Sequence, residues 1–151
     1  MFNFFKKEED YFTLHEKQLI ADAIKNAEQQ TSGEIRVFVE KKCNYVNAID
    51  RAKEIFDKLD MHKTAEKNAV IVYVAFKHRQ LAIFADEGIY QKVGKEFWDN
   101  QVKTMISHFS NNNVIEGITS VIQKIGEALK ENFPYQKNDT NELPNDVVFG
   151  R

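Results

Sequence analysis

The feature that most constrains this chain is an unbroken apolar run at residues 69–76, AVIVYVAF. Valine and isoleucine make up half of it, which favours a strand, and eight residues are far fewer than the roughly 20 that a membrane-spanning helix needs. A strand that is apolar at every position has both of its faces covered. The run therefore predicts the central strand of a sheet packed between two layers. No longer apolar run occurs, so we expect no membrane span.

Two further strands are predicted on either side of this run. Residues 35–40, IRVFVE, alternate with the period of a strand, and residues 81–85 follow a polar turn at 77–80. A helix predicted at residues 47–60 separates the first two strands, which makes them parallel, whereas the tight turn makes the second and third antiparallel. We therefore predict an α/β fold, a three-layer αβα sandwich with a small mixed β-sheet of three to four strands covered by helices on both faces.

The remaining helices are predicted from capping residues and apolar stripes. Thr13 and Glu16 form a capping box at the start of one helix, and Asn113 and Glu116 form a second box at the start of another. The Phe133-Pro134 step ends this last helix, because proline cannot continue the backbone hydrogen-bond ladder. The helical stripes and the strands together predict one hydrophobic core.

The chain length of 151 residues fits one domain. We predict a single domain over residues 1–135, followed by a polar and flexible C-terminal tail over residues 136–151. Within this tail, the short apolar run at residues 147–149 could add an edge strand or dock on a groove. Three apolar residues are too few to predict a strand, so we predict disorder for this run.

Charge and cysteine content exclude several classes of function. The formal net charge is only -2 with both signs mixed along the chain, which argues against a nucleic-acid partner. Cys43 is the single cysteine, so neither an internal disulfide nor a zinc site is indicated. The charged residues at 6–10 interrupt what a signal peptide would need. These observations predict a cytoplasmic protein.

Strand direction brings several acidic residues to one edge of the predicted sheet. Glu34 opens the first strand, and Asp86 and Glu87 leave the third, which runs the other way, so these side chains should meet. Asp99 and Asn113 lie on the helices and loops that follow. Crowded oxygen ligands suit the hard cations Ca²⁺ and Mg²⁺, which predicts a divalent metal site. The alternative is that these residues only cap helices or face solvent.

Five short segments, in order, resemble the landmarks of the TPM domain family over roughly residues 10–133. They are TSGEIRV at 31–37, NAVIVYV at 68–74, DEGI at 86–89, FWD at 97–99 and VIEGI at 114–118. The resemblance implies an αβα sandwich in which two loops cross at one sheet edge and hold divalent metal, often Ca²⁺. A plant relative is associated with acid phosphatase activity and photosystem repair.

The resemblance also assigns site residues. Glu87-Gly88 matches the acidic-glycine turn of the family, and Asp99 matches an aspartate that follows it. Asn113 stands where many members have aspartate, which removes one charge from the implied metal site. The predicted metal ligands are thus Asp86, Glu87, Asp99, Glu34 and Asn113, and the predicted cofactor is Ca²⁺ or Mg²⁺.

Three functions remain open from the sequence. The first is a divalent-metal-binding module in which metal stabilises the crossing loops, in a regulatory or interaction role. The second is a metal-dependent phosphatase acting on phosphomonoesters, for which no catalytic residue can be named, because the four histidines show no partner pattern. The third is a protein-interaction module without metal, in which aromatic residues of the N-terminal segment bind a protein partner; the alternative, which we favour for these residues, is that they fold back on the core of the same chain. These residues are Phe2, Phe4, Phe5, Tyr11 and Phe12.

Overall fold

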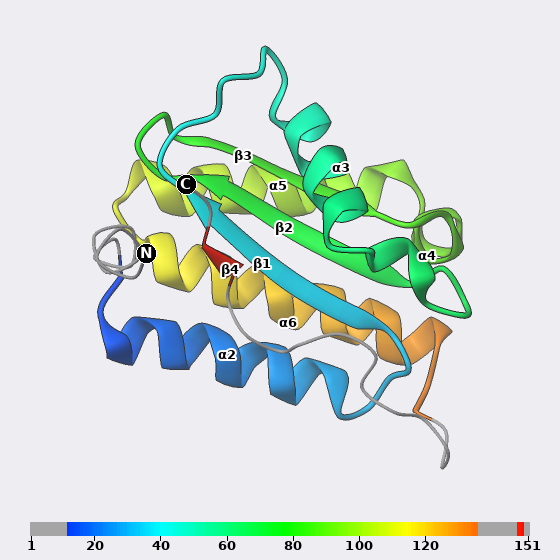
Figure 1. Ribbon diagram of the computed structural model, residues 1–151. Helices are drawn as coiled ribbons and strands as arrows, with labels where there is room; N and C mark the ends of the chain where they lie inside the picture. The colour runs from blue at the N-terminus through cyan, green and yellow to red at the C-terminus, as the bar shows by residue number, and fades with distance from the viewer. Residues whose placement is uncertain (1–11, 136–147, 150–151) are drawn as a thin grey trace.

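The computed structural model describes residues 12–135 and the strand at 148–149. From α2 to α6 the helices and strands follow the order that the sequence predicts, and Figure 1 shows their arrangement. The elements are α2 (Leu14–Glu28), β1 (Glu34–Glu40), α3 (Ala48–Lys58), the 3₁₀ turn η1 (Met61–Lys63), β2 (Ala69–Ala75), β3 (Gln80–Ala85), α4 (Glu87–Val93), α5 (Lys95–Ser110), α6 (Val114–Asn132) and β4 (Val148–Phe149).

The described residues form one mixed sheet with the strand order β3-β2-β1-β4. β1 and β2 are parallel, in a register that pairs Glu34 with Ala69, and β2 and β3 are antiparallel, in a register that pairs Val70 with Ala85. Both directions confirm the prediction from the connecting segments. β2 is buried at every position, as its continuous apolar sequence predicts.

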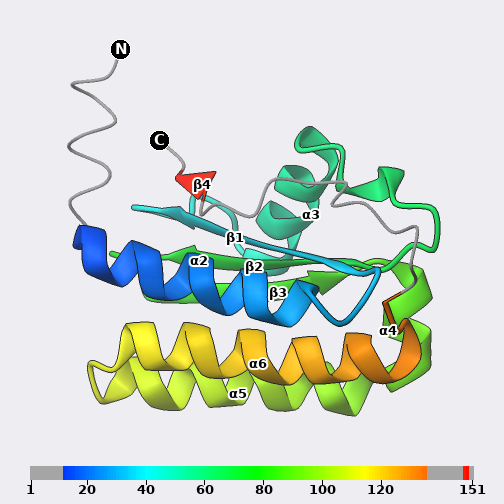
Figure 2. The same ribbon diagram turned by 90° about the horizontal axis from the view of Figure 1, so that it is seen from below.

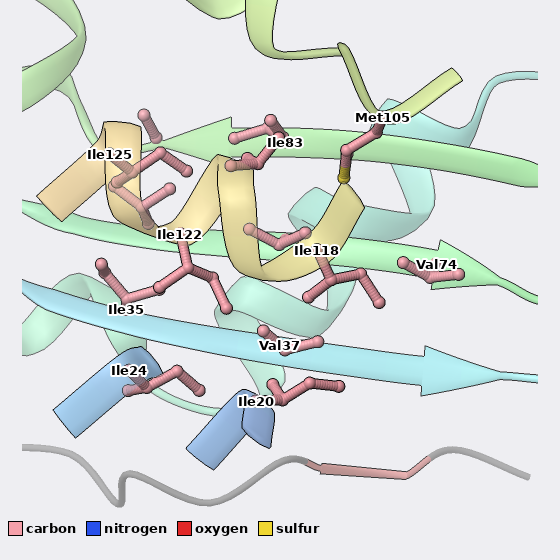
Figure 3. Packing of buried hydrophobic residues seen from close by; sticks show 14 of the residues in the cluster. Ile20, Ile24, Ile35, Val37, Val74, Ile83, Met105, Ile118, Ile122 and Ile125 are labelled. Carbon is pink, nitrogen blue, oxygen red and sulfur yellow. The ribbon is translucent and has the colours of Figure 1, made fainter. Parts of the chain in front are cut away.

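Helices cover both faces of the sheet, which confirms the αβα sandwich (Figure 2). α2, α5 and α6 lie on one face, and α3 lies on the other. The larger core lies under the three helices, where Ile35 and Val37 of β1 meet Ile118 and Ile122 of α6 (Figure 3). A smaller core packs β2 against α3. Apolar burial of this kind contributes about 25 cal/mol per Å², so the two cores supply most of the driving force for folding.

The two predicted capping boxes have different outcomes. Glu16 N donates to Thr13 Oγ1 at 3.0 Å and Thr13 N donates to Glu16 Oε1 at 2.8 Å, so the first box is complete. Asn113 makes no side-chain cap, and the second box is wrong. Its backbone, at φ -103° and ψ 54°, lacks the extended conformation in which an N-cap side chain reaches back to the helix.

The C-terminal residues that the structure describes differ from the favoured prediction of disorder. Val148 and Phe149 form β4, which pairs in parallel with Phe38 and Val39 of β1. The alternative of an edge strand is the one observed, because β1 offers an open hydrogen-bonding edge on that side. The rest of the predicted tail, residues 136–147 and 150–151, lies outside the described residues, as do residues 1–11.

None of the helices in the described part of the chain combines the length and the apolar character that crossing a membrane requires. Trp98 is buried in the larger core, and so is Phe12, whose ring lies edge-on to Phe76 with the centroids 6.5 Å apart. The other aromatic residues of the N-terminal segment lie outside the described residues.

Candidate functional site

The edge where β1 and β2 begin and β3 ends gathers part of the predicted site. Glu34 N donates to Asn68 O at 3.3 Å, and Asp86 N donates to Ala69 O at 3.0 Å. Glu34 and Asp86 therefore lie at the same sheet edge, as strand direction predicts, but their side chains do not meet. β2 runs between them, so their backbones are two strand spacings apart, about 10 Å.

Asp86 is the N-cap of α4 and has one oxygen to spare. Its Oδ1 accepts a hydrogen bond from Glu87 N at 2.8 Å, so the capping interpretation is correct for this residue. Its Oδ2 is buried and has no hydrogen-bond partner in the part of the chain that the structure describes. A buried carboxylate oxygen without a partner is costly, and it marks a place where a further group could bind.

Gly88 brings α4 against the loop that precedes β2. A Cβ atom added to Gly88 would lie 2.5 Å from Lys67 O and closer still to Glu66 O. Ile89 N donates to Lys67 O at 3.2 Å, which fixes the same approach. The two loops thus cross backbone against backbone, and only glycine leaves room for the crossing.

Asp99 lies beside the same cleft but has a partner. Its Oδ2 accepts from Lys95 Nζ at 2.7 Å, one helical turn back along α5. This hydrogen bond raises the pKa of Lys95 above its usual value. Asp99 can join a site with Asp86 and Glu87 only after its carboxylate turns away from the lysine.

Asn113 lies at the opposite edge of the sheet, and the prediction that it joins the acidic residues is wrong. It lines a small pocket with Phe76, which directly follows the end of β2, and with Phe12. The reason is the length of α5, whose 16 residues extend about 24 Å. This helix carries the chain from the Asp86 edge across the whole sheet before Asn113 is reached.

Glu34 belongs to a buried charged group at β1 instead of to the cleft. It is only 3% exposed and interacts electrostatically with Glu28 of α2 and with Arg36, which is also buried. Glu28 Oε2 accepts from Ile35 N at 2.7 Å. Burial, together with the charge of Glu34, raises the pKa of Glu28 from 4.5 to about 8. Burial also lowers the pKa of Arg36.

This raised pKa gives a test by pH. Glu28 binds its proton more tightly in the folded state than in the unfolded chain, so the free energy of unfolding should fall as pH rises from about 5 to 8. Glu28→Gln should flatten that slope, because the amide does not ionise, with a difference on the order of 2 kcal/mol between the two pH values. Urea unfolding across this pH range measures it. Glu131→Gln, on the exposed end of α6, is the control and should leave the slope unchanged.

A cleft of about 830 Å³ runs along β3 beside these acids. It lies between the start of α3 on one side and α4 and α5 on the other. Its walls are mostly apolar, with an acidic end where β3 finishes. Its lining includes Val46, Ile49, Tyr90, Trp98, Asp86 and Glu87.

Sequence reasoning missed a second polar group, at the other end of β1. Glu40 is buried, and Arg51 of α3 donates to both of its oxygens, from Nε at 2.8 Å and from Nη2 at 2.9 Å. The Tyr73 hydroxyl donates to Glu40 as well. Burial and this hydrogen bond raise the pKa of Tyr73. The sequence does offer one signal of this group, because Glu40 is a charged residue at an inward-facing position of a predicted strand.

The described residues contain no group of three or more His, Cys, Asp or Glu side chains arranged to hold a metal ion. The acidic end of the cleft therefore offers two neighbouring carboxylates, Asp86 and Glu87, beside the paired Asp99. Backbone carbonyls of the crossing loop, at Glu66 and Lys67, lie close to Gly88. A cation here would need such carbonyl oxygens and water to complete its coordination.

The comparisons with known proteins agree with one another. The family described as TPM domain matches residues 5–128. The chain is also similar to the NMR structure of the BA42 protein from the psychrophilic bacterium Bizionia argentinensis, with 38% sequence identity and a TM-score of 0.85. That similarity covers 93% of this chain and 96% of the other. No curated protein matches the sequence.

Proposed function

The chain belongs to the TPM domain family, and from this premise we propose that it binds a divalent cation, Ca²⁺ or Mg²⁺, where the loop before β2 crosses the start of α4. In this proposal the bound cation stabilises the crossing loops. The observation that carries it is the buried Oδ2 of Asp86, which has no partner among the described residues. A hard cation is the group that best satisfies such an oxygen.

The proposed ligand set is smaller than the one expected from the sequence. Asp86 is the central ligand, Glu87 is exposed beside it, and the Glu66 carbonyl is close enough to Gly88 to contribute. Asp99 would join only in exchange for its bond to Lys95. Glu34 and Asn113 are left out, because the first lies in the buried group at β1 and the second at the far edge. With two carboxylates, the expected Kd for Ca²⁺ is about 10⁻⁴ to 10⁻³ M.

Calcium titration tests this proposal. Adding Ca²⁺ should shift the amide resonances of residues 64–68 and 86–89 and raise the melting temperature, because a ligand that binds only the folded state stabilises it. Asp86→Asn should weaken binding about tenfold or more, whereas Asp57→Asn, on the exposed face of α3, should leave the affinity unchanged. Lys95→Gln should tighten binding, because it releases Asp99. No saturable response to millimolar Ca²⁺ or Mg²⁺ would sink the proposal.

The phosphatase alternative has no comparable observation in its favour. Phosphoryl transfer at a metal needs a group that positions water or protonates the leaving oxygen. His15, His62, His78 and His108 are all described, and none of them lines the cleft beside Asp86. Cation binding is therefore the function that the geometry supports best.

A further inference from the structure

β3 is the outer strand of the described sheet, and its free edge faces the cleft. Asp86 N donates to Ala69 O, which fixes the alternation of the antiparallel ladder with β2. Residues 80, 82, 84 and 86 point their backbone groups towards β2. Leu81, Ile83 and Ala85 therefore point their N–H and C=O groups outwards, into the cleft that all three of them line.

These outward groups are both unpaired and poorly exposed. Ile83 and Ala85 are only 7% and 6% exposed. Among the described residues, no strand adjoins β3 on that side, and no hydrogen bond from elsewhere in the described chain reaches the outward groups of these residues. Buried backbone donors and acceptors are normally paired, because leaving them unpaired costs about 1–3 kcal/mol each. The edge is thus suited to receive another strand.

The walls of the cleft offer apolar surface on both sides of that edge. Ile49 at the start of α3 and Tyr90 of α4 are large side chains that remain 36% and 39% exposed, and Val46 is almost fully exposed. Across the cleft, the buried indole N–H of Trp98 has no hydrogen-bond partner within the described residues. A strand inserted here would place alternate side chains against α3 and against α5.

We propose that the cleft binds an extended peptide segment of a partner protein, which adds to β3 as an antiparallel strand. β3 spans about 20 Å, the length of a six-residue peptide. α3 and α5 lie on either side of the edge, so a narrow partner such as a single extended strand reaches it more readily than a second folded copy, whose own edge is flanked by the same helices. Main-chain bonding to a sheet edge is an established mode of peptide recognition.

Charge indicates the composition of this antiparallel peptide. Asp86 and Glu87 lie where β3 ends, and the cleft lining carries three acidic residues but one lysine, Lys53. An antiparallel peptide begins beside the end of β3, so its N-terminal residue meets Asp86 and Glu87. A lysine or arginine is therefore favoured at that position, followed by residues with apolar side chains at alternate positions.

The test uses the full chain and a peptide of sequence Arg-Val-Thr-Val-Thr-Val, labelled at its C-terminus, in buffer with EDTA so that metal plays no part. We expect saturable binding and shifts of the amide resonances of Leu81, Ile83 and Ala85. Two N-methylated peptides distinguish a strand ladder from apolar adhesion. One peptide is methylated at the alternate residues whose N–H groups face β3, and it should bind at least about tenfold more weakly. The other is methylated at the residues between them, whose N–H groups face away from β3, and it should bind normally.

Protein variants locate the binding to the cleft. Ile49→Glu should weaken binding. Leu19→Glu, at a position of similar exposure on α2 but remote from the cleft, should not. With both peptides acetylated at the N-terminus, so that neither carries an α-ammonium charge, Glu87→Gln should weaken binding of the arginine peptide and leave unchanged the binding of a peptide that begins with valine. The proposal is overturned if no peptide binds saturably, if both methylation frames bind equally, or if sedimentation shows a dimer that Ile49→Glu dissociates, which would assign the cleft to a second copy.

Discussion

A protein carrying Gly88→Ala should lose at least about 3 kcal/mol of its free energy of unfolding. The added Cβ would meet two backbone carbonyl oxygens, those of Glu66 and Lys67, and no side chain can rotate away to relieve the clash. Overpacking ordinarily costs about 1–3 kcal/mol, and contact with rigid backbone places this substitution at or above the top of that range. Urea unfolding measures the loss.

A substitution three residues further along α4 provides the control. Gln91→Ala changes an exposed position of the same helix and should alter the free energy of unfolding by no more than about 0.5 kcal/mol. In Gly88→Ala, hydrogen exchange should accelerate first at Ile89, whose amide bonds Lys67 O across the crossing. Equal stabilities of the two variants would show that the loops do not cross as closely as the structure has them.

Gly88→Ala also tests how the fold supports the proposed cation site. Gly88 directly follows Asp86 and Glu87, so a shift of α4 away from the 64–68 loop would separate the carboxylates from the Glu66 carbonyl. Gly88→Ala should therefore also weaken Ca²⁺ binding. The acidic-glycine turn then has two roles that act together: glycine permits the crossing, and the acidic residues bind at it.

The fold could be predicted because its elements depend on short-range patterns. The continuous apolar run in β2 requires cover on both faces, and the lengths of the connections on either side of it fix the strand directions. The Thr13 capping box depends on residues three apart, and it is correct. β4 could not be predicted in the same way, because its pairing with Phe38 and Val39 joins segments about a hundred residues apart in sequence.

The candidate site could be predicted only where strand direction determines position. That reasoning placed Glu34 and Asp86 at one edge, but it could not show that Glu34 is buried beside Glu28 and Arg36. Strand direction says nothing of Asn113, because the 16 residues of α5 separate it from the edge that carries Asp86. The remaining contacts depend on how side chains pack, which the sequence pattern does not show. One of them is the ion pair of Glu40 with Arg51, two residues that belong to different layers of the fold.

Loss of Arg51 should have a comparably large effect at the other end of β1. Arg51→Met is expected to lower the free energy of unfolding by about 3–5 kcal/mol, because it leaves the Glu40 carboxylate buried with the Tyr73 hydroxyl as its remaining side-chain donor among the described residues. The Glu40 side chain is only 5% exposed, so solvent screens its charge poorly once the guanidinium is gone. Hydrogen bonds to Glu40 raise the pKa of Arg51, so the guanidinium keeps its charge.

The control for this effect is an exposed ion pair on the same helix. Lys58 lies 4.0 Å from Glu54, and its side chain is 67% exposed, so Lys58→Met should change stability by less than about 1 kcal/mol. The two methionine substitutions remove one positive charge each from α3. A larger loss of the free energy of unfolding in Arg51→Met than in Lys58→Met therefore measures the effect of burying the ion pair. Equal losses would contradict the prediction.

A variant that lacks both charges of the Glu40–Arg51 ion pair distinguishes the energy of that ion pair from the cost of a buried carboxylate that has lost its partner. In Glu40→Leu with Arg51→Met and Tyr73→Phe, no buried charge or hydroxyl is left without its partner, and replacement of a buried ion pair by apolar groups of similar volume is often neutral in stability. The triple variant should therefore be more stable than Arg51→Met alone. If it is instead less stable, the network contributes net stability beyond satisfying its own buried groups, and Glu40 would hold α3 against the sheet more strongly than apolar packing could.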